Sequence, residues 1–219
     1  MKLKFGLLML GALFFMASCG GEKPAETETT HEEHSDHDGH DHGDTEETQA
    51  EPSTYVVDTE ASNIRWEGTA VGVYSHFGNI AIQDGNITVE GNAITAGSFT
   101  IDMTSIDPQD ENYSPEGPKE KLVGHLGSGD FFDIENNPTA TFEITSVEGD
   151  QMTGNLTLRG HTDEEVLTIN QLEIAEDGKM TASATVSFDR QKYGAAYSFA
   201  TDMVLADDID LQIRIVASK

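Results

Sequence analysis

The sequence has a single cysteine and few basic residues. One cysteine, Cys19, excludes a disulfide within the chain. Twelve lysines and arginines stand against 40 aspartates and glutamates, which gives a formal net charge of −28 at pH 7. Even from Thr54 onward, 28 acidic residues face nine basic ones. Because such a surface repels phosphate groups, we do not expect nucleic acid or an anionic lipid surface as a partner.

The motifs of common enzyme classes are also missing. The sequence contains no nucleophile elbow, no phosphate-binding loop and no HExxH zinc motif. Asp130 and Asp133 of the segment DFFD could act as an acid and a base, but we expect them to cap the chain where it enters the next strand. The sequence therefore predicts a protein that is not an enzyme and has no catalytic residues.

Long apolar runs are absent too, because the longest, Phe5–Met16, is too short to span a bilayer. Two lysines precede it and small residues follow it, which is the layout of a secretory signal. Met16-Ala17-Ser18-Cys19 resembles the lipobox of bacterial lipoproteins. This resemblance implies cleavage before Cys19 and acylation of that residue. In many such lipoproteins, an aspartate directly after the cysteine favours retention in the inner membrane. This chain has Gly20 there, so the resemblance implies an outer-membrane lipoprotein of the cell envelope, facing the periplasm or the cell surface.

The segment after the cysteine is strongly acidic. From Gly20 to Ser53 it has twelve acidic residues, one lysine and almost no large apolar side chain. Such a composition cannot bury enough apolar surface to offset the entropy of ordering, so we predict a disordered tether. The predicted organisation is a signal peptide over residues 1–18, a lipidated tether over 19–53 and one domain over 54–219.

The tether contains a histidine-rich tract, HEEHSDHDGHDHGD, with five of the eight histidines of the chain. Imidazole and carboxylate groups bind Zn²⁺, Ni²⁺ or Cu²⁺, so the tract predicts weak, exchangeable metal binding. It lacks the thiolates, fixed spacing and supporting hydrogen bonds of a structural zinc site. A solvated spacer is the alternative. The candidate metal ligands are His31, His34, His37, His40 and His42.

From Thr54 on, apolar and polar residues alternate in short runs, which is typical of half-buried strands. The runs are Asn63–Glu67, Ile80–Ile82, Ile87–Val89, Phe99–Met103, Thr139–Ile144, Met180–Phe188 and Ile209–Ile215. Turns are predicted at Asp84-Gly85, Glu90-Gly91, Glu148-Gly149-Asp150 and Asp177-Gly178. One short helix is predicted over Lys119–Leu126, after Pro118.

No further helical run is long enough to cover a sheet, so the strands must bury their apolar faces against one another. A closed barrel achieves this and leaves no exposed edge. An eight-stranded barrel can either fill its interior with side chains or hold one small ligand. The sequence therefore predicts an all-β antiparallel barrel with one short helix, preceded by a disordered tether.

Several segments resemble the YceI-like family of bacterial exported proteins. They are TYVVDTEASNIRW, SHFG, GSFTIDMTSI, KLVGHLGSGDFFDIENNPTATFEITSV, GNLTLRGHT and SFDRQKYG, and together they cover nearly all of residues 54–219. The resemblance implies a lipocalin-like, eight-stranded antiparallel β-barrel. It also implies that an elongated apolar interior holds a polyisoprenoid chain or an isoprenoid quinone, with no enzymatic activity established for the family as a whole.

Aromatic rings are candidates for lining such a slot, although rings on strands are more often plain core. His76 and His125 match histidines of the family motifs, where an imidazole could bind a quinone carbonyl or a prenyl phosphate. The alternative is that both tie loop backbone together. Arg159 and Arg190 are expected to pair with nearby carboxylates, Arg190 with Asp189. The candidate ligand-binding residues are Trp66, His76, Phe77, Phe99, Ile101, His125, Phe131, Phe142, Phe188 and Tyr193.

Three hypotheses follow from the sequence. The first is a lipid-anchored protein that binds a polyisoprenoid or an isoprenoid quinone and has no other certain cofactor. The second is a metal-binding lipoprotein that acts through the histidine-rich tract. The third is an interaction protein with a filled barrel. The sequence leaves open whether the barrels pair as homodimers.

Overall fold

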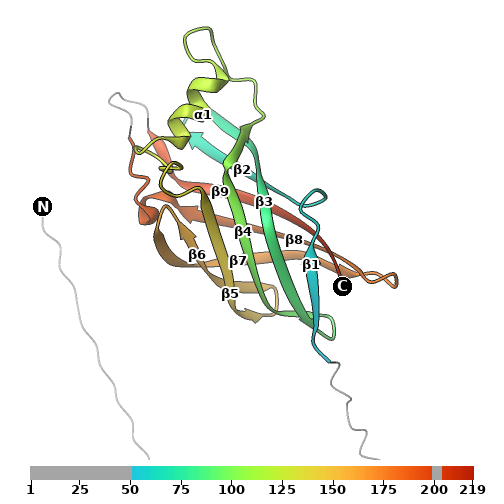
Figure 1. Cartoon of the computed structure of the whole chain (residues 1–219). Helices are drawn as coiled ribbons and strands as arrows, with labels where there is room; N and C mark the ends of the chain where they lie inside the picture. The colour runs from blue at the N-terminus through green and yellow to red at the C-terminus, as the bar shows by residue number, and fades with distance from the viewer. Residues whose placement is uncertain (1–50, 199–203) are drawn as a thin grey trace, which may run out of the picture. The chain divides into compact units, whose positions relative to one another are not determined.

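The computed structural model describes residues 51–198 and 204–219, which form nine strands, one α-helix and one 3-10 helix (Figure 1). Cys19 and the histidines from His31 to His42 lie outside the described residues. The helices are α1 (Lys119–Gly127) and η1 (Arg190–Tyr193). The strands are β1 (Ser53–Val57), β2 (Asn63–Ala70), β3 (Tyr74–Glu90), β4 (Ala93–Pro108), β5 (Thr139–Glu148), β6 (Gln151–Leu158), β7 (His161–Ile174), β8 (Lys179–Asp189) and β9 (Leu205–Ser218).

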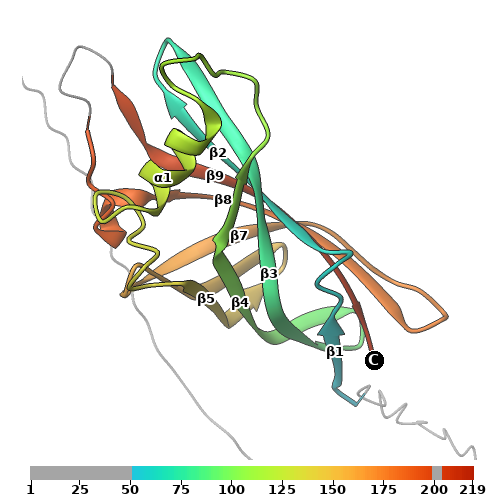
Figure 2. The ribbon, with the colours of Figure 1, turned by 45° about the horizontal axis from the view of Figure 1, so that its top comes forward.

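The strands form one antiparallel sheet that closes on itself, as Figure 2 shows. Consecutive strands pair from β2 through to β9, and β9 returns to pair with β2. Both β1 and β2 pair with β3 and with β9. On β3, the strand β2 pairs with Tyr74–Ile80, and β1 pairs with Asn86–Val89. These two short strands therefore share one position in the barrel. The predicted eight-stranded antiparallel barrel is confirmed.

Three of the four predicted turns are confirmed. They lie between β3 and β4, β5 and β6, and β7 and β8, where Gly91, Gly149 and Gly178 have positive φ angles of 61°, 64° and 83°. Glycine suits these positions because it adopts left-handed backbone without steric cost.

The turn predicted at Asp84-Gly85 is wrong, because β3 runs through it. The register with β4 shifts between Ile82 and Asp84, which places a β-bulge at Gln83, and Asp84 and Gly85 pair with Thr100 and Phe99. A Cβ at Gly85 would lie 2.8 Å from Cδ1 of Phe99. Gly85 therefore leaves room for the ring of Phe99 and does not form a turn.

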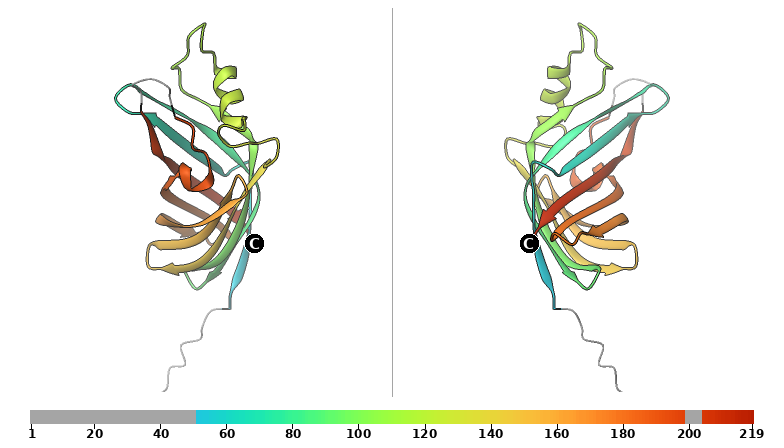
Figure 3. Two further views of the ribbon diagram at one scale, coloured as in Figure 1. Left: turned by 90° about the vertical axis from the view of Figure 1, so that its left-hand side faces the viewer. Right: turned by 90° about the vertical axis from the view of Figure 1, so that its right-hand side faces the viewer.

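The predicted helix is confirmed as α1, and it packs at one end of the barrel against β4. We call this the α1 end, and it also carries the β2–β3 turn and η1 (Figure 1). β1 and the β3–β4 turn lie at the opposite end, the β1 end (Figure 3). Within the described residues, no helix combines the length and apolar character needed to cross a membrane.

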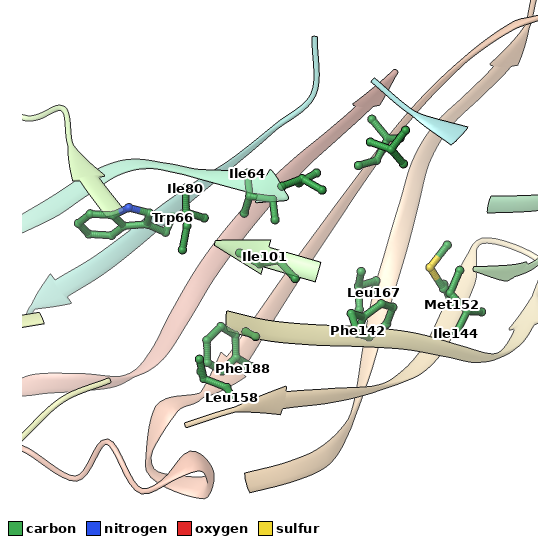
Figure 4. Packing of buried hydrophobic residues seen from close by; sticks show 14 of the residues in the cluster. Ile64, Trp66, Ile80, Ile101, Phe142, Ile144, Met152, Leu158, Leu167 and Phe188 are labelled. Atoms are coloured by element: carbon green, nitrogen blue, oxygen red, sulfur yellow. The ribbon is translucent and has the colours of Figure 1, made fainter. Parts of the chain in front are cut away.

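The inward faces of the strands form the core. Alternate residues of β9, from Ile209 to Ala217, point inward and are mostly buried, as the sequence pattern predicts. Figure 4 shows side chains from different strands, among them Ile64, Ile101, Phe142 and Leu167, directed toward one another inside the barrel.

Candidate functional site

The barrel encloses a cavity of about 300 Å³. Strands β2 to β9 all contribute to its wall, and Leu122, His125 and Leu126 of α1 close part of one end. Most of the lining is isoleucine, leucine, valine, phenylalanine or alanine. A volume of about 300 Å³ lies at the lower limit of ordinary small-molecule sites.

Eight of the ten candidate residues lie in the wall of this cavity. Each strand residue among them shares the inward parity of its strand, so the barrel brings together rings that are far apart in the sequence. Figure 4 labels Trp66, Ile101, Phe142 and Phe188. The eight lining residues are Trp66, His76, Phe99, Ile101, His125, Phe131, Phe142 and Phe188.

The other two candidates, Phe77 and Tyr193, are not part of the wall. Phe77 has the opposite parity to His76 on β3, and its ring lies under the guanidinium of Arg65, 4.3 Å from Cζ to the ring centroid. Tyr193 is fully buried in η1, where its hydroxyl donates to Oε1 of Glu165 at 2.9 Å. Both rings have structural packing roles, so we omit them from the ligand-contacting set.

Residues with a small side chain or none help to shape the interior. Gly154 of β6 faces inward beside Phe142, and a Cβ there would lie 2.3 Å from Cζ of that ring. The edge of the ring therefore lies against the backbone of β6, where any larger residue at position 154 would displace it. Ala140, Ala182 and Ala184 contribute further small side chains to the wall.

The two ends of the cavity differ in burial and polarity. At the β1 end the lining is apolar and buried, with Ile87, Ile94 and Met152 between 2% and 6% exposed. At the α1 end the lining includes Tyr74, which is 36% exposed, and the partly exposed His76. From this difference in exposure we place the opening of the cavity at the α1 end and its apolar base at the β1 end.

His76 and Asp110 form the best-defined polar contact at the opening. Nδ1 of His76 lies 3.0 and 3.1 Å from the two carboxylate oxygens of Asp110. Because an ionised carboxylate only accepts hydrogen bonds, Nδ1 carries the proton in this contact. The Nε2 atom is the nitrogen left for a ligand, and His76 is part of the cavity wall.

Asp110 is held as a carboxylate by several donors. It accepts from the backbone N–H groups of Asn112 at 2.9 Å and Phe77 at 3.3 Å, and from the hydroxyl of Tyr113 at 3.1 Å. Burial alone would raise the pKa of Asp110, but the hydrogen bond from Asn112, the contact with His76 and the hydrogen bond from Tyr113 outweigh it, so the pKa lies below its ordinary value. Burial and then Asp110 raise the pKa of Tyr113 to about 12.

Comparison with known proteins defines the family. The model of the YceI-like domain matches residues 55–217. The chain belongs to the YceI-like family. A UPF0312 protein of Pseudomonas aeruginosa is 34% identical over 122 residues, which are 52% of this chain and 59% of that protein. One of Staphylococcus epidermidis is 31% identical over 108 residues, which are 47% of this chain and 58% of that protein. The matches thus span less than two thirds of either relative.

Solved structures share the fold of this YceI-like barrel at low sequence identity. BcnA of Burkholderia cenocepacia superposes with a TM-score of 0.56 and 18% identity, over 74% of this chain and 99% of BcnA. A polyisoprenoid-binding domain of Saccharophagus degradans, implicated in plant cell wall breakdown, gives a TM-score of 0.51 and 10% identity, over 75% of this chain and 97% of that domain. At these identities the likeness shows the fold alone.

The second motif histidine of the YceI-like barrel, His125, has an aromatic environment. Its ring centroid lies 4.4 Å from that of Tyr197 and 5.7 Å from that of Phe131, both edge to face. Its carbonyl accepts hydrogen bonds from Ser128. The backbone carbonyl of His125 therefore anchors the chain after α1, while its ring belongs to the cavity wall, and both interpretations of its imidazole stay predictions.

One polar lining residue, Glu165 of β7, was missed by the sequence reasoning. It is 8% exposed, accepts from the hydroxyl of Tyr193 and has Nζ of Lys192 3.7 Å from Oε1. Burial and then Glu165 raise the pKa of Tyr193. Alternation could have found this residue, since Glu165 has the same parity as Leu167.

The arginines bind loop carbonyls at the α1 end. Arg190 is 1% exposed and donates to the carbonyl oxygens of Ala195 and Ala206 and, at 3.3 Å, to Oδ1 of Asp207. The expected pair with Asp189 is wrong, because that carboxylate accepts from the N–H of Gln191. Burial lowers the pKa of Arg190, against the opposing effects of Asp207 and Asp189.

Arg159 also departs from the expected pairing with carboxylates. Its guanidinium donates to the carbonyl oxygens of Gly194 and, at 2.6 Å, Gly129. The side chain therefore ties together the loops that follow α1 and η1. The guanidinium binds backbone carbonyls, not the expected carboxylates, because both loops turn their backbone toward Arg159.

Of the two acids of DFFD, Asp133 has a local structural role. Asp133 accepts hydrogen bonds from the side-chain amides of Asn136 and Asn137, at 2.9 and 3.3 Å, and so orders the loop before β5, while Asp130 is exposed. In residues 51–198 and 204–219, no three His, Cys, Asp or Glu side chains are grouped so that they could hold a metal ion. Metal binding by the histidine-rich tract stays a prediction.

Proposed function

We propose that this protein is a binding protein that holds an isoprenoid lipid, either a polyisoprenoid or an isoprenoid quinone, inside its barrel. One observation carries the proposal: an apolar cavity runs from the buried Ile87 and Met152 to the partly exposed Tyr74 and His76. A ligand that fits such a space has a long apolar part and a small polar head. Binding, not catalysis, is the proposed activity.

The energetics favour an apolar chain. Burying apolar surface contributes about 25 cal/mol per Å², so a chain that loses about 400 Å² gains on the order of 10 kcal/mol before the entropy of binding is subtracted. The preformed wall lowers that entropic cost, because the strands are already fixed by the barrel. Dispersion contacts with the rings of Phe99 and Phe142 add to the same effect.

The polar groups at the opening favour one orientation, with the head at the α1 end. The Nε2 atom of a neutral His76 accepts a hydrogen bond from an alcohol or a quinol, and a protonated imidazole donates one to a carbonyl or phosphate oxygen. Asp110 stabilises both states, since it binds the Nδ1 proton in each. His76 is therefore the proposed head-group contact.

The likeness to a polyisoprenoid-binding domain of Saccharophagus degradans supports this ligand class. From the sequence we further propose an outer-membrane lipoprotein, anchored through Cys19 and facing the periplasm or the cell surface. Its partners would then be an isoprenoid lipid in the barrel and the membrane at the anchor.

Filling the cavity tests the proposal. Ala182 lies in the wall and is 6% exposed, so Ala182→Phe places a ring in the empty space without displacing a large side chain. Thr185→Phe is the matched control, because Thr185 lies on the same strand but is exposed on the outer face. Each protein is purified from a host rich in quinones and polyprenols, and its organic extract is analysed by mass spectrometry.

We expect a stoichiometric isoprenoid in the extract of the wild type and of Thr185→Phe, and none from Ala182→Phe. Replacing wall rings, in Phe99→Ala and Phe142→Ala, should weaken uptake of added ubiquinone or menaquinone. A wild-type protein that carries no isoprenoid and takes up neither quinone contradicts the proposal and favours an interaction protein with a filled barrel.

A further inference from the structure

An exposed apolar cluster lies next to the opening of the cavity. Val71 and Val73 of the β2–β3 turn are 55% and 59% exposed, Tyr74 at the start of β3 is 36% exposed, and Val204 before β9 is 61% exposed. The backbone N–H of Val71 donates to the carbonyl of Val204 at 2.8 Å, so the two segments are neighbours. We call these four residues the apolar tip. They are four of the six large apolar side chains that are exposed in the described residues.

The apolar tip is continuous with the interior of the barrel. Tyr74 belongs both to the tip and to the cavity wall. Ala70 and Leu205, which adjoin Val71 and Val204 in the chain, also line the cavity. An apolar surface thus runs from the outside of the protein into the space proposed for the ligand.

The charge pattern separates the β2–β3 hairpin, which carries three of the four tip residues, from the rest of the domain. From Gly68 to Gln83 the sequence contains no aspartate, glutamate, lysine or arginine, although the chain carries 40 acidic residues. The outer surface therefore repels an anionic partner, and this hairpin does not. An uncharged apolar surface on an acidic protein fits a membrane whose surface has little net charge.

The backbone of the apolar tip is suited to an apolar environment. Besides the bond from Val71 to Val204, the N–H of Val73 donates to the carbonyl of Ala70 at 3.0 Å. These donors need no water, so moving the turn into the lipid headgroup region does not leave them unsatisfied. A stable protein interface buries roughly 800 Å² on each partner, more than the few hundred Å² that four partly exposed side chains offer.

The chain before β1 has the length that such docking requires. Ser53 lies at the β1 end, opposite the apolar tip, and β3, with 17 residues, spans roughly 55 Å between the ends. Residues 19–52 reach roughly 110 Å when fully extended. An anchor at Cys19 therefore does not prevent the opposite end of the barrel from facing the same membrane.

We propose that Val71, Val73, Tyr74 and Val204 dock the opening of the barrel on the surface of a zwitterionic lipid bilayer. Docking places the opening where a water-insoluble ligand can pass between the membrane and the cavity. This inference rests on the proposed function for its purpose, but membrane binding by the apolar tip is measured without any ligand.

The test is flotation with vesicles of phosphatidylcholine. It uses the chain from Gly20 to Lys219, which keeps the whole barrel and all of the segment after Cys19 and has no acylation site. Val71→Asp/Val73→Asp places two charges on the apolar tip. Val56→Asp is the matched control, because Val56 is 62% exposed but lies on β1 at the other end.

We expect the wild type and Val56→Asp to float with the vesicles, and the double variant to bind about tenfold more weakly or worse. Raising the salt concentration should leave wild-type binding unchanged, and adding phosphatidylglycerol to the vesicles should weaken it. The inference is overturned if the wild type does not float, or if the double variant floats equally well. It is also overturned if size-exclusion chromatography shows that the double variant converts a wild-type dimer to a monomer.

A second measurement does not depend on the folding of the double variant. The chain from Gly20 on has no cysteine, so Val73→Cys can carry a single environment-sensitive fluorophore. Its emission should shift to the blue with vesicles, whereas a label at Asn92→Cys, in the β3–β4 turn, should not respond. Equal responses at both positions contradict docking by the apolar tip. Organic extracts of the same proteins report on the ligand, so failure of the proposed function is recognised separately.

Discussion

Replacing Asp110 by asparagine should destabilise the barrel and also change how its stability depends on pH. Oδ1 of Asp110 accepts from the N–H of Asn112, and Oδ2 accepts from the N–H of Phe77 and the hydroxyl of Tyr113. Asparagine keeps one oxygen and presents an NH₂ group in place of the other. At least one buried donor then loses its acceptor, at a cost of about 1–3 kcal/mol, and His76 loses its charged partner. We expect a total loss of about 2–4 kcal/mol.

The pH dependence follows from the direction of the pKa shift. The pKa of Asp110 is lower in the folded protein than in the unfolded chain, where an aspartate titrates near pH 3.9. A carboxylate with a depressed folded pKa stabilises the fold above its unfolded pKa, and this contribution disappears as the pH falls through the folded value. The difference in unfolding free energy between wild type and Asp110→Asn should therefore be constant near neutral pH and shrink below about pH 4.

Urea unfolding at a series of pH values measures both effects. Glu111→Gln is the control, because Glu111 is the adjacent, exposed carboxylate, and its replacement should change the free energy of unfolding by less than about 0.5 kcal/mol. If Asp110→Asn costs no more than this control, Asp110 does not hold the loop. If Asp110→Asn lowers the unfolding free energy by a large amount that does not shrink below about pH 4, the charge of the carboxylate is not the cause.

Three further predictions concern other parts of the chain. Arg190→Met should lower the unfolding free energy by about 3–5 kcal/mol, because it leaves buried carbonyls without a donor, whereas the exposed Arg214→Met should cost much less in the same urea experiment. Cys19→Ala, expressed behind a signal peptide that does not require the cysteine, should move the protein from the washed membrane fraction to the soluble fraction, and full retention would argue against the lipid anchor. Deletion of residues 31–42 should remove Zn²⁺ or Ni²⁺ binding of about micromolar affinity or weaker, seen by calorimetry, and leave the melting temperature of the barrel unchanged; a large drop in melting temperature would show that this tract belongs to the fold.

The sequence alone determines most of the barrel, because burial of one face imposes a period of two on each strand. Ile209 to Ile215 shows this pattern without interruption, and it becomes β9 with its apolar residues inside. Pro118 likewise marks the start of α1, since proline is tolerated at a helix start but not inside. Strand alternation and helix starts are local rules. They predict the structure correctly wherever pairing with neighbouring strands does not impose a different one.

Other features depend on contacts between segments that are distant in the chain. Asp84-Gly85 has turn chemistry, yet it lies within β3, because pairing with β4 continues on both sides of it. His76 meets Asp110 through the pairing of β3 with β4, and Arg190 meets Asp207 through the pairing of β8 with β9. Local pattern supplies no information about partners at such separations.

The candidate site divides in the same way. Alternation alone places Phe142 on an inward face, and it could have placed Phe77 outside and Glu165 inside. What the alternation leaves undecided is whether inward side chains fill the barrel or leave a cavity. That depends on how the rings and the small residues from eight strand positions fit together, as where Gly154 lies beneath Phe142, so only the tertiary structure decides it.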